Sequence, residues 1–181
     1  MRYINFLFVI ALVAFLGSCT IDEQVDPNGP SINSVLSDAS LTELNLLVLG
    51  TDARMRNGFG TYVTATGSIA REMYKFDADP RNTEDLLGKE GRSLDRNTFY
   101  LTNPYGTRYR VVKNCNILLD ALDNTSSVSE NAKQGYRGFA NTVKAYMLFH
   151  VLNMLDDNGI RVDVADPNNL GPFVSRADAF K

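Results

Sequence analysis

The chain has 181 residues, a formal net charge of −3, and a composition that is 44% hydrophobic and 22% charged. These proportions are typical of a globular protein and exclude disordered, collagen-like and disulfide-stapled chains. The negative charge disfavours nucleic acid as a partner, because its binders carry clustered lysine and arginine. A single histidine, His150, and two cysteines, Cys19 and Cys115, exclude most zinc sites and any histidine-dependent triad not built on His150.

Residues 1–18 have the parts of a secretory signal peptide. Arg2 gives a cationic start, an apolar run extends from Phe6 to Leu16, and Gly17-Ser18 supply small residues. The run is shorter than the roughly 20 residues that cross a bilayer, and it lacks the polar stripe of a core helix. We therefore expect this segment to be a signal peptide that is cleaved from the mature protein.

The sequence Leu16-Gly17-Ser18-Cys19 resembles the lipobox of bacterial lipoproteins, in which cleavage falls just before a cysteine that receives lipid on its sulfur. The resemblance implies three acyl chains at Cys19, and two chains already anchor a protein stably. The alternative is a cysteine that happens to follow an ordinary signal. With Cys19 acylated, Cys115 has no intramolecular partner, and we expect it to be a small buried apolar side chain.

Residues 19–40 are predicted to form a flexible tether. Pro27, Gly29 and Pro30 lie among acidic and small polar residues, and no helical or strand periodicity is present before Leu41. Such a segment would let the folded body stand away from the lipid surface.

Two helices are expected after the tether. Ser40 and Glu43 have the spacing of a capping box, and one apolar stripe continues from there towards Asn57-Gly58. A second stripe places five residues on one helical face: Tyr62, Ala65, Ile69, Met73 and Phe76. A polar loop over residues 77–97 follows, and long loops in compact domains are often functional.

Two further helices are expected beyond this loop. The third should begin at Pro104, because proline is favoured in a first turn. The fourth should begin at Ser127, which has capping-box spacing to Glu130, and end at Asn158-Gly159.

The fourth helix contains Gly135 and Gly138, which each cost roughly 1 kcal/mol against alanine in a helix interior. We expect a neighbouring helix backbone to approach closely there. Only residues 160–164 alternate as a strand does, so the predicted fold class is all-α. Consecutive helices joined by loops also suit stacked, tetratricopeptide-like hairpins.

The residues Ser175 to Asp178 have the spacing of another helix start, yet the sequence stops at Lys181. One turn buries almost nothing and cannot offset its nucleation cost. We expect the chain to be the N-terminal part of a longer protein, a frayed tail being the alternative.

Four segments resemble the SusD/RagB family of nutrient-uptake outer-membrane lipoproteins, in the family's order: residues 105–116, 135–146, 157–161 and 168–173. The resemblance implies that residues 41–181 are the N-terminal helical part of a SusD-like domain. It also implies a surface-exposed, lipid-anchored protein of the outer membrane that is not an enzyme. Such a protein captures a glycan, oligosaccharide or peptide for a SusC-like TonB-dependent transporter. A helical scaffold lipoprotein of envelope assembly is the alternative, and a surface glycosidase is a more distant one.

Ligand capture requires aromatic faces with polar neighbours, so that a ring can stack while its edges form hydrogen bonds. The candidates flank the polar loop: Phe76, Asn97, Phe99 and Tyr100. The alternative is that these side chains only pack the helix ends. The absence of tryptophan modestly weakens the hypothesis of a glycan ligand and leaves a peptide ligand as an alternative.

No catalytic or cofactor motif is present. His150 lies on the apolar stripe of the fourth helix and is expected to be a core residue. A solvated turn is expected at Asp156 and Asp157. The segment Asp77-Ala78-Asp79 begins like a calcium-binding loop, but Arg81 occupies the next ligand position, so it does not match one. We therefore expect no cofactor, no metal and no catalytic residue.

Overall fold

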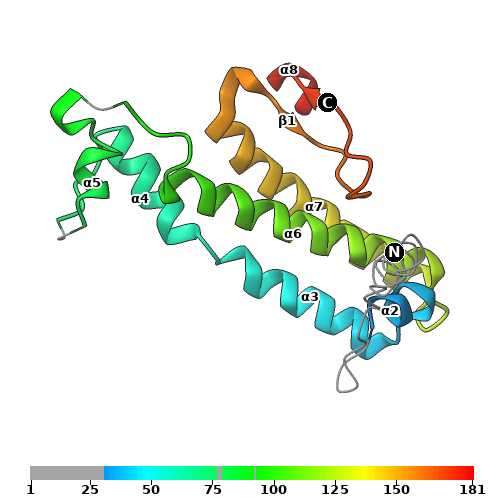
Figure 1. Cartoon of the computed structure of the whole chain (residues 1–181). Helices are drawn as coiled ribbons and strands as arrows, with labels where there is room; N and C mark the ends of the chain where they lie inside the picture. The colour runs from blue at the N-terminus through cyan, green and yellow to red at the C-terminus, as the bar shows by residue number, and fades with distance from the viewer. Residues whose placement is uncertain (1–30, 77–78, 92) are drawn as a thin grey trace, which may run out of the picture. The chain divides into compact units, whose positions relative to one another are not determined.

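Two long antiparallel helices dominate the computed structural model, which describes residues 31–76, 79–91 and 93–181 (Figure 1). They are α6 (Phe99–Asn124) and α7 (Glu130–Leu155), each 26 residues long. The shorter helices are α2 (Ile32–Asp38), α3 (Leu41–Met55), α4 (Phe59–Ile69), α5 (Arg81–Glu84) and α8 (Arg176–Ala179), with 3-10 turns η1 (Lys89–Gly91) and η2 (Asp156–Asn158). The predicted all-α class is confirmed. The signal segment, Cys19 and the first part of the tether lie outside the described residues.

The core lies between α6 and α7, with α3 against α6. It is built from aliphatic side chains at helical spacing on both long helices, such as Val111, Leu118, Val143 and Val151. Cys115 is fully buried among them, and burial raises the pKa of its thiol to about 11. It is thus the buried apolar side chain that the sequence predicts, and its protonated state makes it a poor nucleophile.

Helix α3 begins as predicted. The Ser40 hydroxyl oxygen accepts a bond from the Glu43 backbone N–H, and the Glu43 carboxylate accepts one from the Ser40 N–H at 2.8 Å. The carboxylate also accepts from the Ser40 hydroxyl at 2.7 Å, and its bonds to the Ser40 hydroxyl and N–H lower the pKa of Glu43. Leu44 is completely buried, and the helix ends at Met55, just before the predicted stop at Asn57-Gly58.

The expected tether is wrong for its last residues, because Ile32–Asp38 forms helix α2. Val35 and Ala39 are buried in the core. The turn after α6 holds this helix: Asn124 Nδ2 donates to the Leu36 carbonyl at 2.9 Å, and the Ser126 N–H donates to Asp38 Oδ1 at 2.8 Å. A helix this short has too few apolar positions to show a period.

Helix α4 is shorter than its apolar stripe predicts. The N–H groups of Glu72 and Met73 both donate to the Gly67 carbonyl, at 2.9 and 3.2 Å, and Arg71 adopts a left-handed φ of 63°. This local bonding ends the helix at Ile69, so Met73 and Phe76 lie beyond it.

Both long helices begin at residues that differ from the prediction. Helix α6 starts at Phe99, and Pro104 is buried inside it at the cost of one backbone hydrogen bond. For α7, the cap is Ser129, whose hydroxyl oxygen accepts from the Ala132 N–H at 3.3 Å. Ser127 is instead held in the turn, because its N–H donates to Thr125 Oγ1 at 3.1 Å.

The expected close approach at Gly135 and Gly138 is wrong. Both residues are exposed, and a Cβ atom built on either would meet no heavy atom of the described residues within 4 Å. The two glycines therefore face open space on α7.

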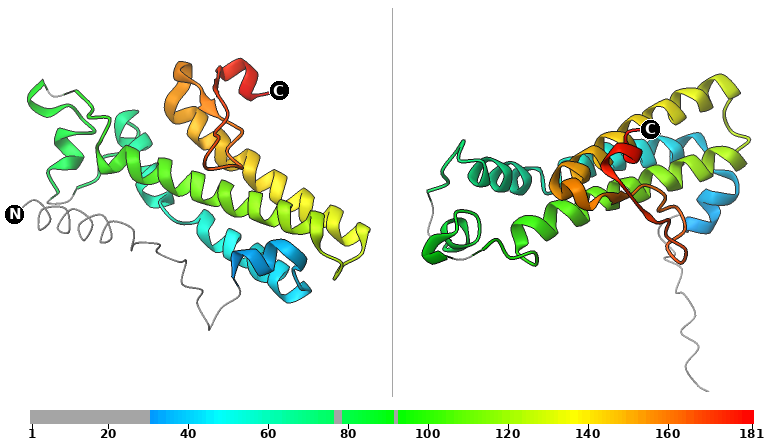
Figure 2. Two further views of the ribbon diagram at one scale, coloured as in Figure 1. Left: turned by 45° about the vertical axis from the view of Figure 1, so that its right-hand side comes forward. Right: turned by 90° about the horizontal axis from the view of Figure 1, so that it is seen from above.

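The chain returns across the long helices after α7 (Figure 2). Residues 160–174, which we call the strap, contain strands β1 (Ile160–Arg161) and β2 (Phe173–Val174), paired antiparallel with Ile160 opposite Val174. Gly159 permits the turn into the strap with a φ of 69°. Ser175 caps α8 by accepting from the Asp178 N–H, as the sequence predicts.

Candidate functional site

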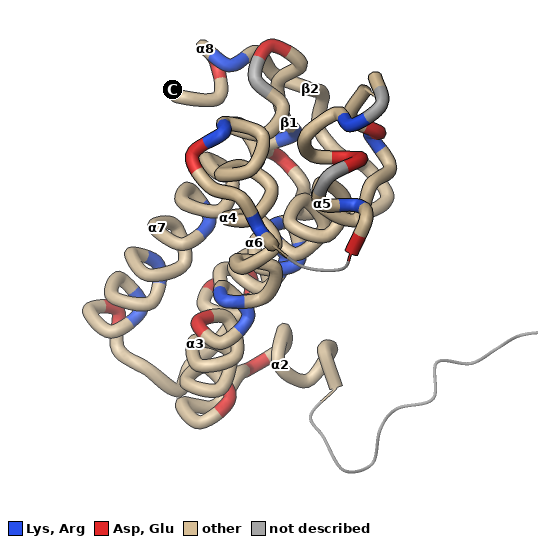
Figure 3. The backbone as a smooth tube through the Cα atoms, turned by 90° about the vertical axis from the view of Figure 1, so that its left-hand side faces the viewer, with Lys and Arg blue, Asp and Glu red and all other residues tan. Residues whose placement is uncertain are grey.

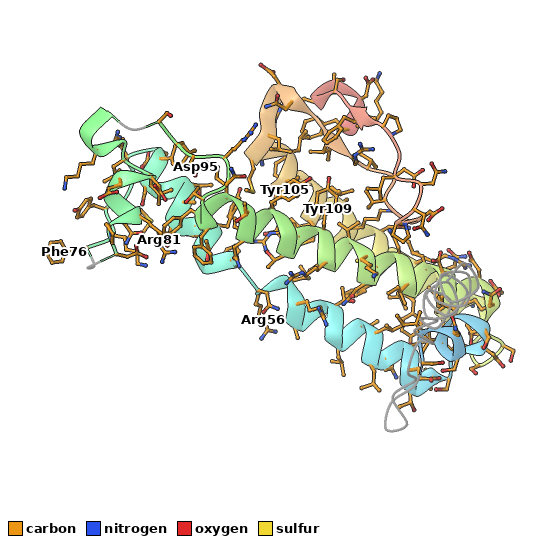
Figure 4. The ribbon with its side chains drawn as sticks, in the orientation of Figure 1. Arg56, Phe76, Arg81, Asp95, Tyr105 and Tyr109 are labelled. Carbon is orange, nitrogen blue, oxygen red and sulfur yellow. The ribbon has the colours of Figure 1, made fainter. Side chains whose placement is uncertain are left out.

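The four predicted ligand residues do not form a common aromatic face. Phe76 is 93% exposed and projects away from the helices, and Phe99 is 44% exposed with the Arg81 guanidinium 5.5 Å from its ring centre (Figure 4). The Asn97 side chain is exposed, and its backbone N–H donates to Asp95 Oδ1 at 2.9 Å.

Tyr100 differs from the expectation, because only 3% of it is exposed. Its ring packs with Ala65 and Leu86, and its hydroxyl donates to Asn82 Oδ1. Adjacent helical positions point about 100° apart, so Phe99 faces outward where Tyr100 faces inward. Tyr100 thus attaches the loop to the helices and offers no face to a ligand.

A cavity of about 290 Å³ lies between α6 and the strap. Its helical wall is made by Tyr105, Tyr109 and Lys113, which follow one another at four-residue spacing along one face of α6. Its other wall includes Arg161 and Leu170 of the strap. Both tyrosines lie on the side of α6 that faces the strap (Figure 4). We call this cavity the tyrosine pocket.

The two tyrosines are held in place. Their ring centres are 5.0 Å apart and their planes are tilted by 57°, a favourable aromatic arrangement. The Tyr109 hydroxyl donates to the Arg161 carbonyl at 2.9 Å. Burial raises the pKa of Tyr109 to about 12, so this hydroxyl stays protonated and able to donate at neutral pH.

The two basic side chains of the tyrosine pocket, Arg161 and Lys113, differ in how many contacts hold them. Arg161 Nη1 donates to the Gly171 carbonyl, and its guanidinium stacks 4.5 Å from the Phe173 ring centre. The Lys113 side chain is exposed and forms no ion pair or hydrogen bond with the described residues. The pocket therefore combines aromatic faces, one guanidinium held by its contacts and one ammonium group that is unpaired among the described residues.

Sequence reasoning missed this pocket. The spacing of Tyr105, Tyr109 and Lys113 was a usable signal, since it places all three on one helical face. The opposite wall was not accessible to the same reasoning, because Tyr109 and Arg161 are 52 positions apart.

A second cavity of about 420 Å³ lies between α7 and the C-terminal residues. Its lining is mainly apolar, including Leu148, Phe149, Ile160 and Phe180, with Lys144 at the edge. The rings of Phe149 and Phe180 are 6.2 Å apart. Nothing in this lining suggests bond-making chemistry, and Lys144 is the one charged side chain in it.

A buried polar cluster joins α4, α6 and α7. Arg108 is completely buried and donates from Nη1 to the Asn57 carbonyl at 2.8 Å, while Nε and Nη2 have no partner among the described residues. Its guanidinium lies 5.6 Å from the Tyr62 ring centre. Burial lowers the pKa of Arg108, although a guanidinium remains charged at neutral pH.

His150 belongs to this cluster. Its ring lies 4.8 Å from that of Tyr62 and 4.5 Å from that of Tyr146, and only 7% of the residue is exposed. This placement confirms the predicted core position. Burial, with a smaller contribution from the charge of Arg108, lowers the pKa of His150.

The described part of the chain contains no group of three or more histidine, cysteine or acidic side chains placed to hold a metal ion. None of its helices is long and apolar enough to span a bilayer. Lysine and arginine positions are interspersed with acidic ones along the helices (Figure 3). Comparisons with protein-family models, with curated proteins and with solved structures found no match.

Proposed function

We propose that this chain is a lipid-anchored binding protein of the outer-membrane surface, which captures a nutrient and delivers it to a SusC-like TonB-dependent transporter. The observation that carries the proposal is the tyrosine pocket: two tyrosine rings and two basic side chains around an open cavity of about 290 Å³. The residues that line its helical wall lie within residues 105–116, one of the segments that resemble the SusD/RagB family. The lipobox-like Leu16-Gly17-Ser18-Cys19 supports the anchor.

Binding of this kind requires no bond to be made or broken. Aromatic faces stack on the C–H face of a sugar or on an apolar peptide side chain, and neighbouring donors bond the polar edges. The long helices α6 and α7 hold Tyr105 and Tyr109 on a rigid, buried scaffold, so little order is lost when a ligand binds. A tetratricopeptide-like arrangement of the hairpins is part of the same proposal.

The proposal is tested by ligand binding with the full chain purified in detergent. Isothermal titration against panels of oligosaccharides and peptides should find a ligand, and Tyr105→Ala should weaken its binding about fivefold, because stacking contributes on the order of 1 kcal/mol. Phe76→Ala is the matched control, since Phe76 is an exposed aromatic outside the pocket. We expect it to bind as the wild type does.

The partner is tested separately. A tagged chain, extracted from native outer membranes under mild conditions, should copurify with a TonB-dependent barrel. Absence of any ligand in both panels, together with copurification of envelope-assembly proteins instead of a barrel, would contradict the proposal.

A further inference from the structure

We propose that the tyrosine pocket selects a sugar residue that carries a carboxylate, that is, one of the hexuronic acid class. This inference rests on the function proposed above and specifies the ligand of the same site. Three observations support it: the charge of the lining, the aromatic surface of the helical wall and the size of the cavity.

The charge of the lining is opposite to that of the chain. The sequence has 21 acidic against 18 basic side chains, yet the pocket is lined by Lys113 and Arg161 and by no acidic residue. The nearest acids in sequence, Asp163 and Asp166, belong to the strap but do not line the cavity. Within the lining of the cavity an anionic ligand therefore meets two cations and no carboxylate.

The two cations of the lining suit a carboxylate. Arg161 is oriented by its bond to the Gly171 carbonyl and by stacking on Phe173, so its remaining donors keep a fixed direction. Lys113 is exposed and unpaired among the described residues, so its ammonium group can follow the ligand. Charge-assisted bonds of this type are about twice as strong as neutral ones.

The rest of the lining favours a ring over a small inorganic anion. Tyr105 and Tyr109 give the helical wall an aromatic surface, and Val164, Pro167 and Leu170 contribute apolar surface. A phosphate or sulfate ion could bond the two cations but would gain nothing from these faces, because it has no apolar surface to place against them. A pyranose ring has a C–H face for the tyrosines and polar edges for the cations.

The cavity is small. At about 290 Å³ it lies at the lower limit of ligand pockets, which run from roughly 300 to 1,000 Å³. It therefore accommodates one sugar residue, with its glycosidic neighbours outside in solvent.

The test compares methyl glucuronide with methyl glucoside, which differ only in the carboxylate, by titration of the full chain in detergent. We expect the glucuronide to bind at least tenfold more tightly, with the preference falling as salt is raised. Lys113→Gln should reduce the preference several-fold. Lys144→Gln, which removes a lysine from the other cavity, is the matched control and should leave it unchanged. Both substitutions remove the charge and shorten the side chain by one atom, so they are matched to each other, and circular dichroism checks that both variants fold.

Three outcomes would overturn the inference in distinguishable ways. Equal binding of the two glycosides would refute selection of the carboxylate and leave the proposed nutrient-binding function standing. Equal or tighter binding of acetate or benzoate would show that the sugar ring is not recognised. Failure of every sugar and peptide to bind would remove the proposed function as well.

Discussion

Arg108 is the side chain with the least expected environment. It is fully buried, yet among the described residues it forms one side-chain hydrogen bond, to the Asn57 carbonyl, and its guanidinium lies against the Tyr62 ring. Taking a cation out of water is costly unless bonds replace the lost hydration. Arg108 compensates in part by satisfying the carbonyl of the α3–α4 turn, so it joins α6 to that turn.

Two substitutions distinguish the contribution that the volume of Arg108 makes to stability from the contribution of its charge. Arg108→Ala should lower the free energy of unfolding by about 3 kcal/mol, because it leaves a cavity and an unsatisfied Asn57 carbonyl. Arg108→Met keeps most of the volume and removes the buried charge, so it should cost much less. Urea denaturation measures both. Equal losses in the two variants would show that the charge, and not the packing, is what stabilises this junction.

His150 predicts a pH dependence of stability. Because its pKa is lowered in the folded state, the unfolded chain binds more protons below the ordinary histidine pKa of about 6.5. Stability should therefore fall as the pH is lowered from 7.5 to 5.5. His150→Phe keeps the ring contacts with Tyr62 and Tyr146 and should show a smaller fall. Thermal unfolding at the two pH values measures this, and an unchanged fall in the variant would assign it to other groups.

At the scale of single elements, the glycines illustrate how local geometry decides the effect of one residue type. Gly135 and Gly138 lie in a helix with open space at the Cβ position. Gly159 instead has a φ of 69°, and a Cβ there would lie 2.0 Å from the Val174 carbonyl oxygen. The first two only weaken α7, whereas the third is required for the turn that brings β1 to β2.

These glycines give opposite predictions for the same substitution. Gly135→Ala and Gly138→Ala should each raise the free energy of unfolding by about 0.5–1 kcal/mol, since alanine is the better helix former. Gly159→Ala should lower it, because of both strain and collision. Denaturant titration of the three variants measures this. A loss of stability in Gly138→Ala would indicate a close neighbour on that face of α7.

For the molecule as a whole, the sequence predicted what depends on local periodicity and capping. The helical class, the Ser40 cap and the left-handed turn at Gly159, which follows α7 and η2, all depend on residues within a few positions of one another. The misses have two kinds of cause. Local bonds at Gly67 and Ser129 set the end of α4 and the start of α7, whereas helix α2 is held by the turn after α6 and the tyrosine pocket needs the strap to lie over α6.

The proposed anchor predicts where the whole protein is found. Cys19→Ala should remove the only thiol that the lipobox-like sequence offers for acylation, and the chain should then be soluble or unprocessed. Cys115→Ala is the control and should stay in the membrane fraction, because Cys115 is buried in the core. Carbonate washing followed by immunoblotting measures both. Retention of the Cys19 variant after the wash would contradict a lipid anchor.

The bond from Tyr109 to the Arg161 carbonyl has a consequence for detecting a ligand. The strap that this bond fastens is closed upon itself by the Gly171 amide, which donates to the Asp163 carbonyl at 2.9 Å. Any molecule seated between α6 and the strap must make opening of the strap less frequent. Deuterium uptake at the Gly171 amide would then slow in proportion to occupancy, giving a label-free signal for screening mixtures of unknown composition.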